Sequence, residues 1–171
     1  MSLQPRARWG LLLGVAATVL AVDQLTKWWA TETLDDRVID VVWTLRFSLT
    51  LNHGSAFSIV QSGGAVISLL ALLVVGLLLR SGRRATHPGS AVALGLVLGG
   101  AVGNLADRAF RAGDGFLGGG VVDFVDLQWW PVFNVADMAV VSGAFLLLFT
   151  SWRDELADSR QADDRAPSEP V

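Results

Sequence analysis

The chain has 171 residues, of which 52% are hydrophobic and only 17% are charged, and its formal net charge is −3. This composition, with a mean hydropathy of +0.49, is typical of a membrane protein, because a soluble domain needs more charge on its surface. There is no basic stripe of the kind that binds nucleic acid, and the absence of cysteine excludes disulfides, thiol nucleophiles and thiolate metal sites.

Four apolar segments are predicted to be membrane-spanning helices, at about residues 9–30, 63–80, 90–108 and 132–152. At a rise of 1.5 Å per residue, about 20 residues cross a hydrocarbon core of about 30 Å. Six of the seven tryptophans lie at or beside the ends of these segments, as in an aromatic belt, and Trp43 is the exception. We expect residues 1–152 to form one membrane domain and residues 153–171 to form a disordered cytoplasmic tail.

The arginines predict how these segments are oriented. They precede the first segment and separate the second from the third, which places both termini in the cytoplasm and the stretches 31–62 and 109–131 outside. A cleaved signal peptide is the alternative for the first segment, because a basic start precedes the apolar run 9–22. The apolar character resumes after Asp23 and no clear A-x-A site follows the run, which favours a retained helix.

The first outer stretch, about residues 36–60, has the pattern of a small β-sheet. Leu45–Asn52 alternates between apolar and polar residues, as a half-buried strand does, and the β-branched run Val38–Trp43 is expected to pair with it. Asn52–Ser55 indicates a turn, and Gly118–Gly120 indicates a flexible patch in the second outer stretch. The predicted fold class is therefore an all-α membrane protein with four transmembrane helices and a small extracytoplasmic β-sheet.

Five aspartates lie inside or beside the apolar segments: Asp23, Asp107, Asp123, Asp126 and Asp137. A carboxylate near hydrocarbon is costly, so each is a candidate functional residue. The predicted topology brings all five close to the outer boundary of the membrane. An acidic cluster at one membrane face is therefore expected.

Residue spacing sharpens this expectation. Asn104 lies three residues before Asp107, and Asn134 lies three residues before Asp137, so each amide shares a helix face with a carboxylate that it can orient. Glycines at every fourth position from Gly95 to Gly103 allow a neighbouring helix to pack closely, which would bring the two pairs together.

Structural roles are open for several of these acids. Asp23 with Lys27 at i+4 fits a helix salt bridge, Asp107 beside Arg108 fits an interfacial charge pair, and Asp126 fits a solvated loop. The two histidines are too few and too far apart for a metal site. No serine has a paired histidine, while a dyad of a serine with the only lysine remains open.

Asp137 is the strongest candidate for chemistry, because it lies within an apolar helix and has no basic residue within four positions. Two carboxylates a few ångströms apart share one proton, so that one acts as a base toward water and the other as an acid toward a carbonyl. Such a pair needs no metal or cofactor and predicts a bell-shaped pH profile. A cation-coupled transporter and a non-catalytic membrane scaffold are the alternatives.

Five short motifs occur in one order along the chain: Asp23–Lys27, Asn52–Phe57, Gly99–Arg108, Val121–Phe124 and Phe133–Asp137. Together they resemble the bacterial lipoprotein signal peptidases (signal peptidase II), over about residues 9–152. The resemblance implies a multi-pass aspartic endopeptidase of the inner membrane, with its active site near the outer face and no cofactor. It would remove signal peptides from diacylglyceryl-modified prolipoproteins, before the lipidated Cys, and would be inhibited by globomycin.

The resemblance also implies roles for individual residues. It assigns the catalytic pair to Asp123 and Asp137, although topology alone would pair Asp107 with Asp137. The glycine-rich loop before Asp123 is longer than is usual in the family, which leaves Asp114 and Asp126 as competing positions, and the intact motif Val121–Phe124 favours Asp123. The expected supporting or substrate-binding positions are Asp23, Lys27, Asn52, Gly54, Asn104, Asp107, Arg108 and Asn134.

Overall fold

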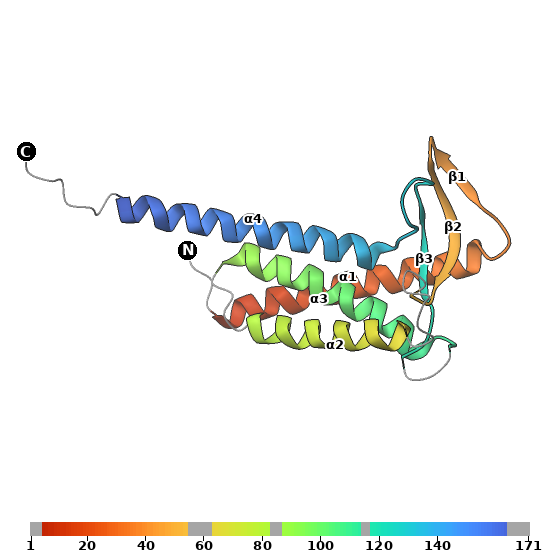
Figure 1. Cartoon of the computed structure of the whole chain (residues 1–171), viewed down its shortest axis with the longest axis horizontal. Helices are drawn as coiled ribbons and strands as arrows, with labels where there is room; N and C mark the ends of the chain where they lie inside the picture. The colour runs from red at the N-terminus through yellow and green to blue at the C-terminus, as the bar shows by residue number, and fades with distance from the viewer. Residues whose placement is uncertain (1–4, 55–62, 83–86, 114–116, 164–171) are drawn as a thin grey trace, which may run out of the picture.

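The computed structural model is a bundle of four helices with a three-stranded sheet across one end (Figure 1). It describes residues 5–54, 63–82, 87–113 and 117–163. The helices are α1 (Pro5–Thr33), α2 (Gly63–Gly82), α3 (Pro88–Phe110) and α4 (Val135–Asp163), and the strands are β1 (Ile39–Val42), β2 (Leu45–Asn52) and β3 (Val121–Asp126).

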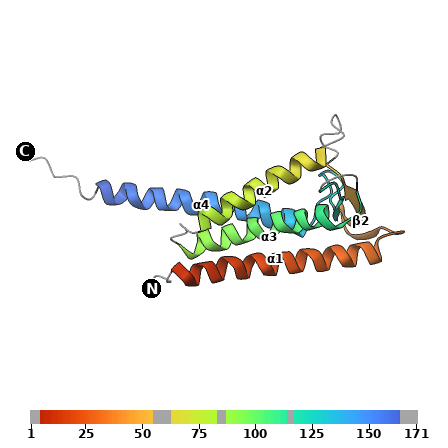
Figure 2. The same cartoon turned by 90° about the horizontal axis from the view of Figure 1, so that it is seen from below.

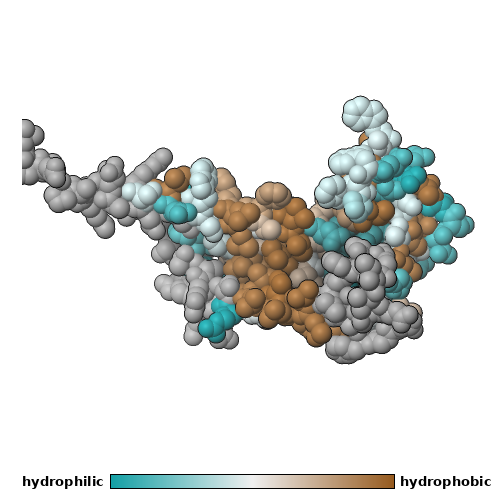
Figure 3. Space-filling view, viewed as in Figure 1, coloured by the Kyte–Doolittle hydropathy of each residue, from teal (hydrophilic) through white to brown (hydrophobic). Residues whose placement is uncertain are grey.

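Three of the helices contain a segment long and apolar enough to cross a membrane: Arg8–Thr33, Pro88–Phe110 and Val135–Arg153. The apolar stretch of α2, Ser68–Arg80, is shorter among the described residues. The structure therefore supports three of the four predicted membrane helices, and a brown apolar band over the helices is visible in Figure 3.

The last helix is longer than the sequence pattern predicts. We expected disorder from residue 153, but α4 continues to Asp163, and the remainder, 164–171, lies outside the described residues. The added segment contains alanine, leucine, arginine and glutamate, which are good helix formers.

α3 is the central helix, and it packs against both α1 and α4 (Figure 2). A Cβ on Gly95 would lie 2.7 Å from the carbonyl oxygen of Leu12, and one on Gly99 would lie 2.6 Å from that of Ala16. The predicted glycine stripe is thus a close-packing face, but it faces α1. Gly100, one position further on, makes the corresponding approach to α4 at the carbonyl of Ala136.

The predicted hairpin forms the outer part of the sheet. β1 pairs antiparallel with β2, as the alternation predicted, and β2 pairs with β3, a strand that the sequence analysis assigned to a loop. β3 is buried almost throughout, so it lacks the alternation of a half-exposed strand. In the glycine patch that the sequence predicts to be flexible, Gly119 and Gly120 are buried just before β3, and Gly119 forms an isolated β-bridge with Gly113.

Aromatic rings fix the sheet on the end of α1. Trp29 of α1 meets Phe47 of β2 and Phe124 of β3 edge-on, with ring centroids 5.5 and 6.1 Å apart. Ala30, Leu34 and further residues of β3 complete this small core. The sheet is therefore positioned by the same helix that carries Asp23 and Lys27.

Candidate active site

Asp123 and Asp137 come from neighbouring elements that are held together by backbone hydrogen bonds. Asp123 lies in the middle of β3 and is 2% exposed, and Asp137 lies in the first turn of α4. Between them the chain folds back, because Val125 N–H donates to Phe133 O at 2.8 Å and Phe133 N–H donates to Val125 O at 3.1 Å. This closed loop brings the start of α4 against β3.

Asn134 bridges the two carboxylates. Its Nδ2 donates to Asp123 Oδ1 at 2.6 Å, and its backbone N–H donates to Asp137 Oδ2 at 3.2 Å. Its own Oδ1 accepts from Asp137 N–H at 3.0 Å, so Asn134 and Asp137 form a reciprocal cap at the start of α4. Asn134, the residue just before α4, therefore caps the helix and also sets the relative position of both acids.

Asn52 holds the other oxygen of Asp123. Its Nδ2 donates to Asp123 Oδ2 at 3.0 Å, and its Oδ1 accepts from Gly54 N–H at 2.9 Å. Gly54 has a φ of 84°, a conformation that favours glycine, so the turn predicted at this place orients the amide toward Asp123. Asn52, an expected supporting residue, thus contacts Asp123 directly, and Gly54 holds the amide of Asn52 in place.

The environment of Asp123 favours its protonated form. Burial is the largest cause that raises the pKa of Asp123, to about 6, and the charge of Asp137 acts in the same direction. The hydrogen bonds from Asn52 and Asn134 act against this rise, because they stabilise the carboxylate. With a pKa of about 6, Asp123 exchanges its proton in mildly acidic solution.

Asp126 has the opposite environment, although it lies on the same strand. Arg46 Nε lies 2.7 Å from Asp126 Oδ2, and Gln128 N–H donates to Oδ1 at 2.7 Å. These contacts hold the pKa of Asp126 below its usual range. Our interpretation of Asp126 as a solvated loop residue was wrong, since it is buried and ion-paired. Asp114, the other competitor, lies outside the described residues.

Lys27 is the centre of a buried charge cluster beside this pair. Its side chain is fully buried, and Nζ lies 2.9 Å from Asp23 Oδ2 and 2.9 Å from Asp107 Oδ2. The expected Asp23–Lys27 salt bridge is confirmed. The expected pairing of Asp107 with Arg108 is wrong. Asp107 instead forms ion pairs with Lys27 and with Arg111, whose Nε lies 2.9 Å from Asp107 Oδ1.

Asn104 connects the charge cluster to the two acids. Its Oδ1 accepts from Lys27 Nζ at 2.9 Å and from Asn134 Nδ2 at 3.1 Å. With the oxygen so occupied, its Nδ2 faces Asp137 and donates to Oδ1 at 2.8 Å. Lys27 thereby fixes which way the amide of Asn104 points.

The cluster also positions the backbone around both acids. Asp23 Oδ1 accepts from Ala136 N–H at 2.9 Å, and Asp107 Oδ2 accepts from Val122 N–H at 3.1 Å. Ala136 precedes Asp137 in sequence, and Val122 precedes Asp123. The supporting roles expected for Asp23 and Asp107 therefore correspond to direct contacts with the neighbours of the pair.

Arg108 lies at the edge of the same region and is half-buried. Its Nη1 donates to Asn104 O at 3.3 Å, and its Nε has no hydrogen-bond partner among the described residues. The charges of Asp123 and Asp137 both act on its guanidinium. Arg108 thus has a free donor close to the two acids.

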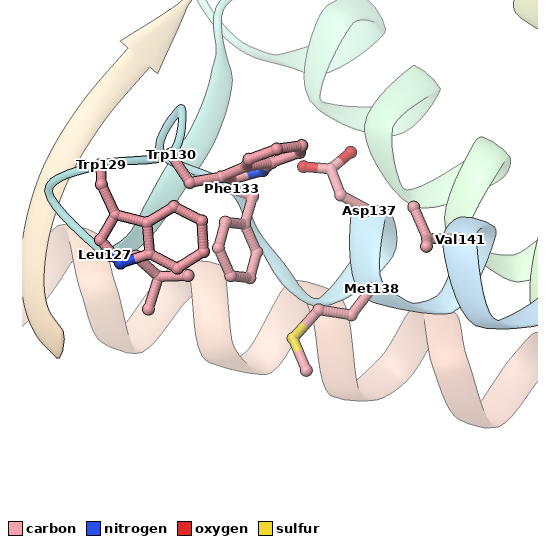
Figure 4. A pocket seen from close by; sticks show the side chains of 7 residues that line it. All are labelled: Leu127, Trp129, Trp130, Phe133, Asp137, Met138 and Val141. Atoms are coloured by element: carbon pink, nitrogen blue, oxygen red, sulfur yellow. The ribbon is translucent and has the colours of Figure 1, made fainter.

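An apolar pocket of about 390 Å³ opens beside Asp137 (Figure 4). In Figure 4 the ring of Trp130 and the carboxylate of Asp137 point toward one another. Their place before an apolar segment predicts Trp129 and Trp130 only as interface residues, and nothing in the sequence marks them as neighbours of Asp137. The pocket is lined by Leu127, Trp129, Trp130, Phe133, Asp137, Met138 and Val141.

The chain is similar to known proteins over most of its length. The family model described as signal peptidase (SPase) II matches residues 15–153. The lipoprotein signal peptidase of Mycobacterium avium (strain 104) is 48% identical over 150 residues, covering 86% of this chain and 82% of the relative. That of Mycolicibacterium smegmatis is 44% identical over 171 residues, covering 96% and 72%.

The fold is also that of a solved protein. A bacterial membrane enzyme determined by the in meso method at 1.9 Å resolution superposes with a TM-score of 0.73. The two sequences are 25% identical, and the match covers 85% of this chain and 94% of the solved one.

Proposed function

Since the chain belongs to the signal peptidase II family of membrane enzymes, which cleave the signal peptides of lipoproteins, we propose that Asp123 and Asp137 are its catalytic pair. The observation that carries this proposal is the bridge through Asn134, which donates to both carboxylates. Asp126 has no such role, because its carboxylate is neutralised by Arg46. The chain would then be an aspartic endopeptidase.

The different environments of the two acids suggest a division of labour. Asp137 accepts hydrogen bonds from Asn104 and Asn134 and acts as the base that removes a proton from water. The water oxygen bonds to the scissile carbonyl carbon, and Asp123 gives its proton to the carbonyl oxygen. When the C–N bond breaks, Asp137 gives its proton to the leaving nitrogen, and Asp123 takes back a proton from a hydroxyl of the gem-diol as the new carboxyl group forms. Both acids thereby regain their starting states.

One further feature fits the binding of a lipid-modified precursor. The pocket beside Asp137 can hold an apolar part of the substrate. The substrate would be a diacylglyceryl-modified prolipoprotein, cut before the lipidated Cys. The sheet end would face outward, α2 would be a fourth membrane helix, and both termini would lie in the cytoplasm.

A cleavage assay tests this proposal directly. A synthetic diacylglyceryl prolipoprotein peptide, incubated with the full chain in lipid, should be cut once, before the lipidated Cys, and mass spectrometry identifies the products. Globomycin should block the reaction, whereas a metal chelator and a serine-directed reagent should not. Cleavage that survives globomycin but stops with either other reagent would contradict an aspartic mechanism.

The pKa of Asp123 predicts the high-pH side of the activity profile. Because Asp123 must carry a proton and its pKa is raised to about 6, kcat/KM should fall as the pH rises above about 6. Asn52→Leu removes a hydrogen bond that stabilises the carboxylate, so this fall should move to higher pH. Thr50→Val, at the exposed position opposite Asp123, is the matched control and should leave the profile in place. If Asn52→Leu does not shift the pH profile, Asp123 is not the protonated acid of the reaction.

A further inference from the structure

Exposed apolar and aromatic side chains gather at one edge of the sheet end. Trp43 is 101% exposed, Trp129 is 69% exposed and Trp130 is 59% exposed. We call this group, with the exposed neighbours Val41 and Val42 on β1, the tryptophan edge. Seen in Figure 3, this end of the molecule projects sideways beyond the apolar band of the helices.

The fold does not explain the tryptophan at position 43. Trp43 and Thr44 form the two-residue connection between β1 and β2, and Trp43 has a φ of 57°. Glycine or asparagine favours this left-handed conformation in a hairpin turn, whereas a large aromatic residue does not. Full exposure also means that the ring is not packed against the protein. Neither turn geometry nor a core contact therefore accounts for Trp43.

The two parts of the tryptophan edge are joined. Gln128 Nε2 donates to Thr44 O at 3.0 Å, which links the hairpin turn to the loop that carries Trp129 and Trp130. Gln128 itself has a φ of 67°, so both segments keep an unfavourable backbone conformation beside an exposed tryptophan. The edge is thus one surface made of two chain segments.

This surface continues the apolar side of a membrane-spanning helix. Trp129 and Trp130 line the pocket together with Met138 and Val141, which are exposed on the span Val135–Arg153 of α4. In Figure 1 the β1–β2 hairpin reaches past α4 on the side away from α2. Any lipid that covers this side of α4 therefore also reaches the tryptophan edge.

We propose that the tryptophan edge inserts into the lipid leaflet around the sheet end of α4. Tryptophan suits this place, because its ring is apolar and its indole N–H finds partners among headgroups and water. The sheet then overhangs the leaflet instead of standing in water, and lipid closes the open side of the pocket. This inference rests on the contact of α4 with lipid and does not depend on the catalytic assignment.

The absence of native cysteine allows a single-label test. A spin label is attached to Val41→Cys in the full chain, which is placed in nanodiscs of phosphatidylglycerol and phosphatidylethanolamine. This label should collide more often with lipid-soluble oxygen than with a water-soluble nickel chelate. The matched control is Asp36→Cys, also exposed but located before β1, and it should show the reverse preference. Adding Trp43→Asn to the Val41→Cys chain should remove the preference for oxygen while the thermal unfolding temperature stays the same or rises.

Other outcomes would overturn the proposal. They are equal preference at the two labelled positions, a preference for oxygen that survives Trp43→Asn, and dipolar broadening that shows a second copy against the edge. If the Trp43→Asn chain does not fold, Trp129→Gln in the same Val41→Cys chain gives the decisive comparison. Cleavage activity is measured separately, so a failure of the proposed catalytic pair would leave this result unaffected.

Discussion

Asp123→Asn and Asp137→Asn should each lower kcat for cleavage of a lipidated precursor by about 10²–10⁴-fold, the range for loss of a positioned acid or base. Asparagine keeps the size of the side chain but can neither take a proton from water nor give one to a carbonyl. In Asp123→Asn the new amide nitrogen must also face the Nδ2 of Asn52 or of Asn134, so some loss of stability is expected. Initial rates and thermal unfolding in lipid, measured together, separate the two effects.

Asp126→Asn is the matched control, because Asp126 is also buried in β3 and lies three positions from Asp123. Its ion pair with Arg46 would be weakened, so stability should fall while most of the activity remains. Full activity in either variant of the pair would remove that residue from the mechanism. An equal loss in Asp126→Asn would show that the geometry of β3, and not an acid at 123, is what matters.

Lys27→Met should have the largest effect on stability. Lys27 is fully buried between Asp23 and Asp107, so its removal leaves two buried carboxylates facing each other without the central cation. Breaking a buried ion pair in this way costs about 3–5 kcal/mol. Chemical or thermal unfolding in lipid measures the loss. Activity should also fall in the fraction that remains folded, because Lys27 no longer fixes the amide of Asn104.

A double variant distinguishes charge imbalance from lost packing. Lys27→Met with Asp23→Asn removes one carboxylate together with the cation, and should recover part of the lost stability. Arg111 still neutralises Asp107 in that chain. Two results would show that the charges do not hold the cluster together. One is an unfolding free energy of Lys27→Met equal to that of the unchanged chain. The other is a loss of unfolding free energy in the double variant that exceeds the sum of the losses in the two single variants.

Much of the fold could be predicted from local patterns. Apolar length predicted the spans in α1, α3 and α4, and strict alternation predicted the β1–β2 hairpin. β3 was missed for a physical reason. It is short, it carries two acids, and it is buried on both faces, so its sequence shows neither alternation nor an unbroken apolar run.

The candidate site could be predicted as a set of residues but not as a set of contacts. Asp107 was paired with Arg108 by adjacency, yet adjacent residues on a helix point in different directions, while Arg111 at i+4 lies on the same face. The other partner, Lys27, comes from α1. Likewise Arg46 reaches Asp126 only through the register of β2 against β3. Such contacts depend on how the elements pack, which the motifs do not encode.

The fold-back between Val125 and Phe133 has a mechanical consequence. Asp123 and Asp137 are separated by few residues in the chain, and the intervening loop is closed by its own backbone hydrogen bonds. Helices in a bilayer tilt to match its thickness, so a site assembled from two distant helices would change its spacing with lipid composition. Here the spacing of the two acids is set within one short, self-closed stretch of chain. Their separation should therefore be the same in thin and thick membranes, however the helices around them lean.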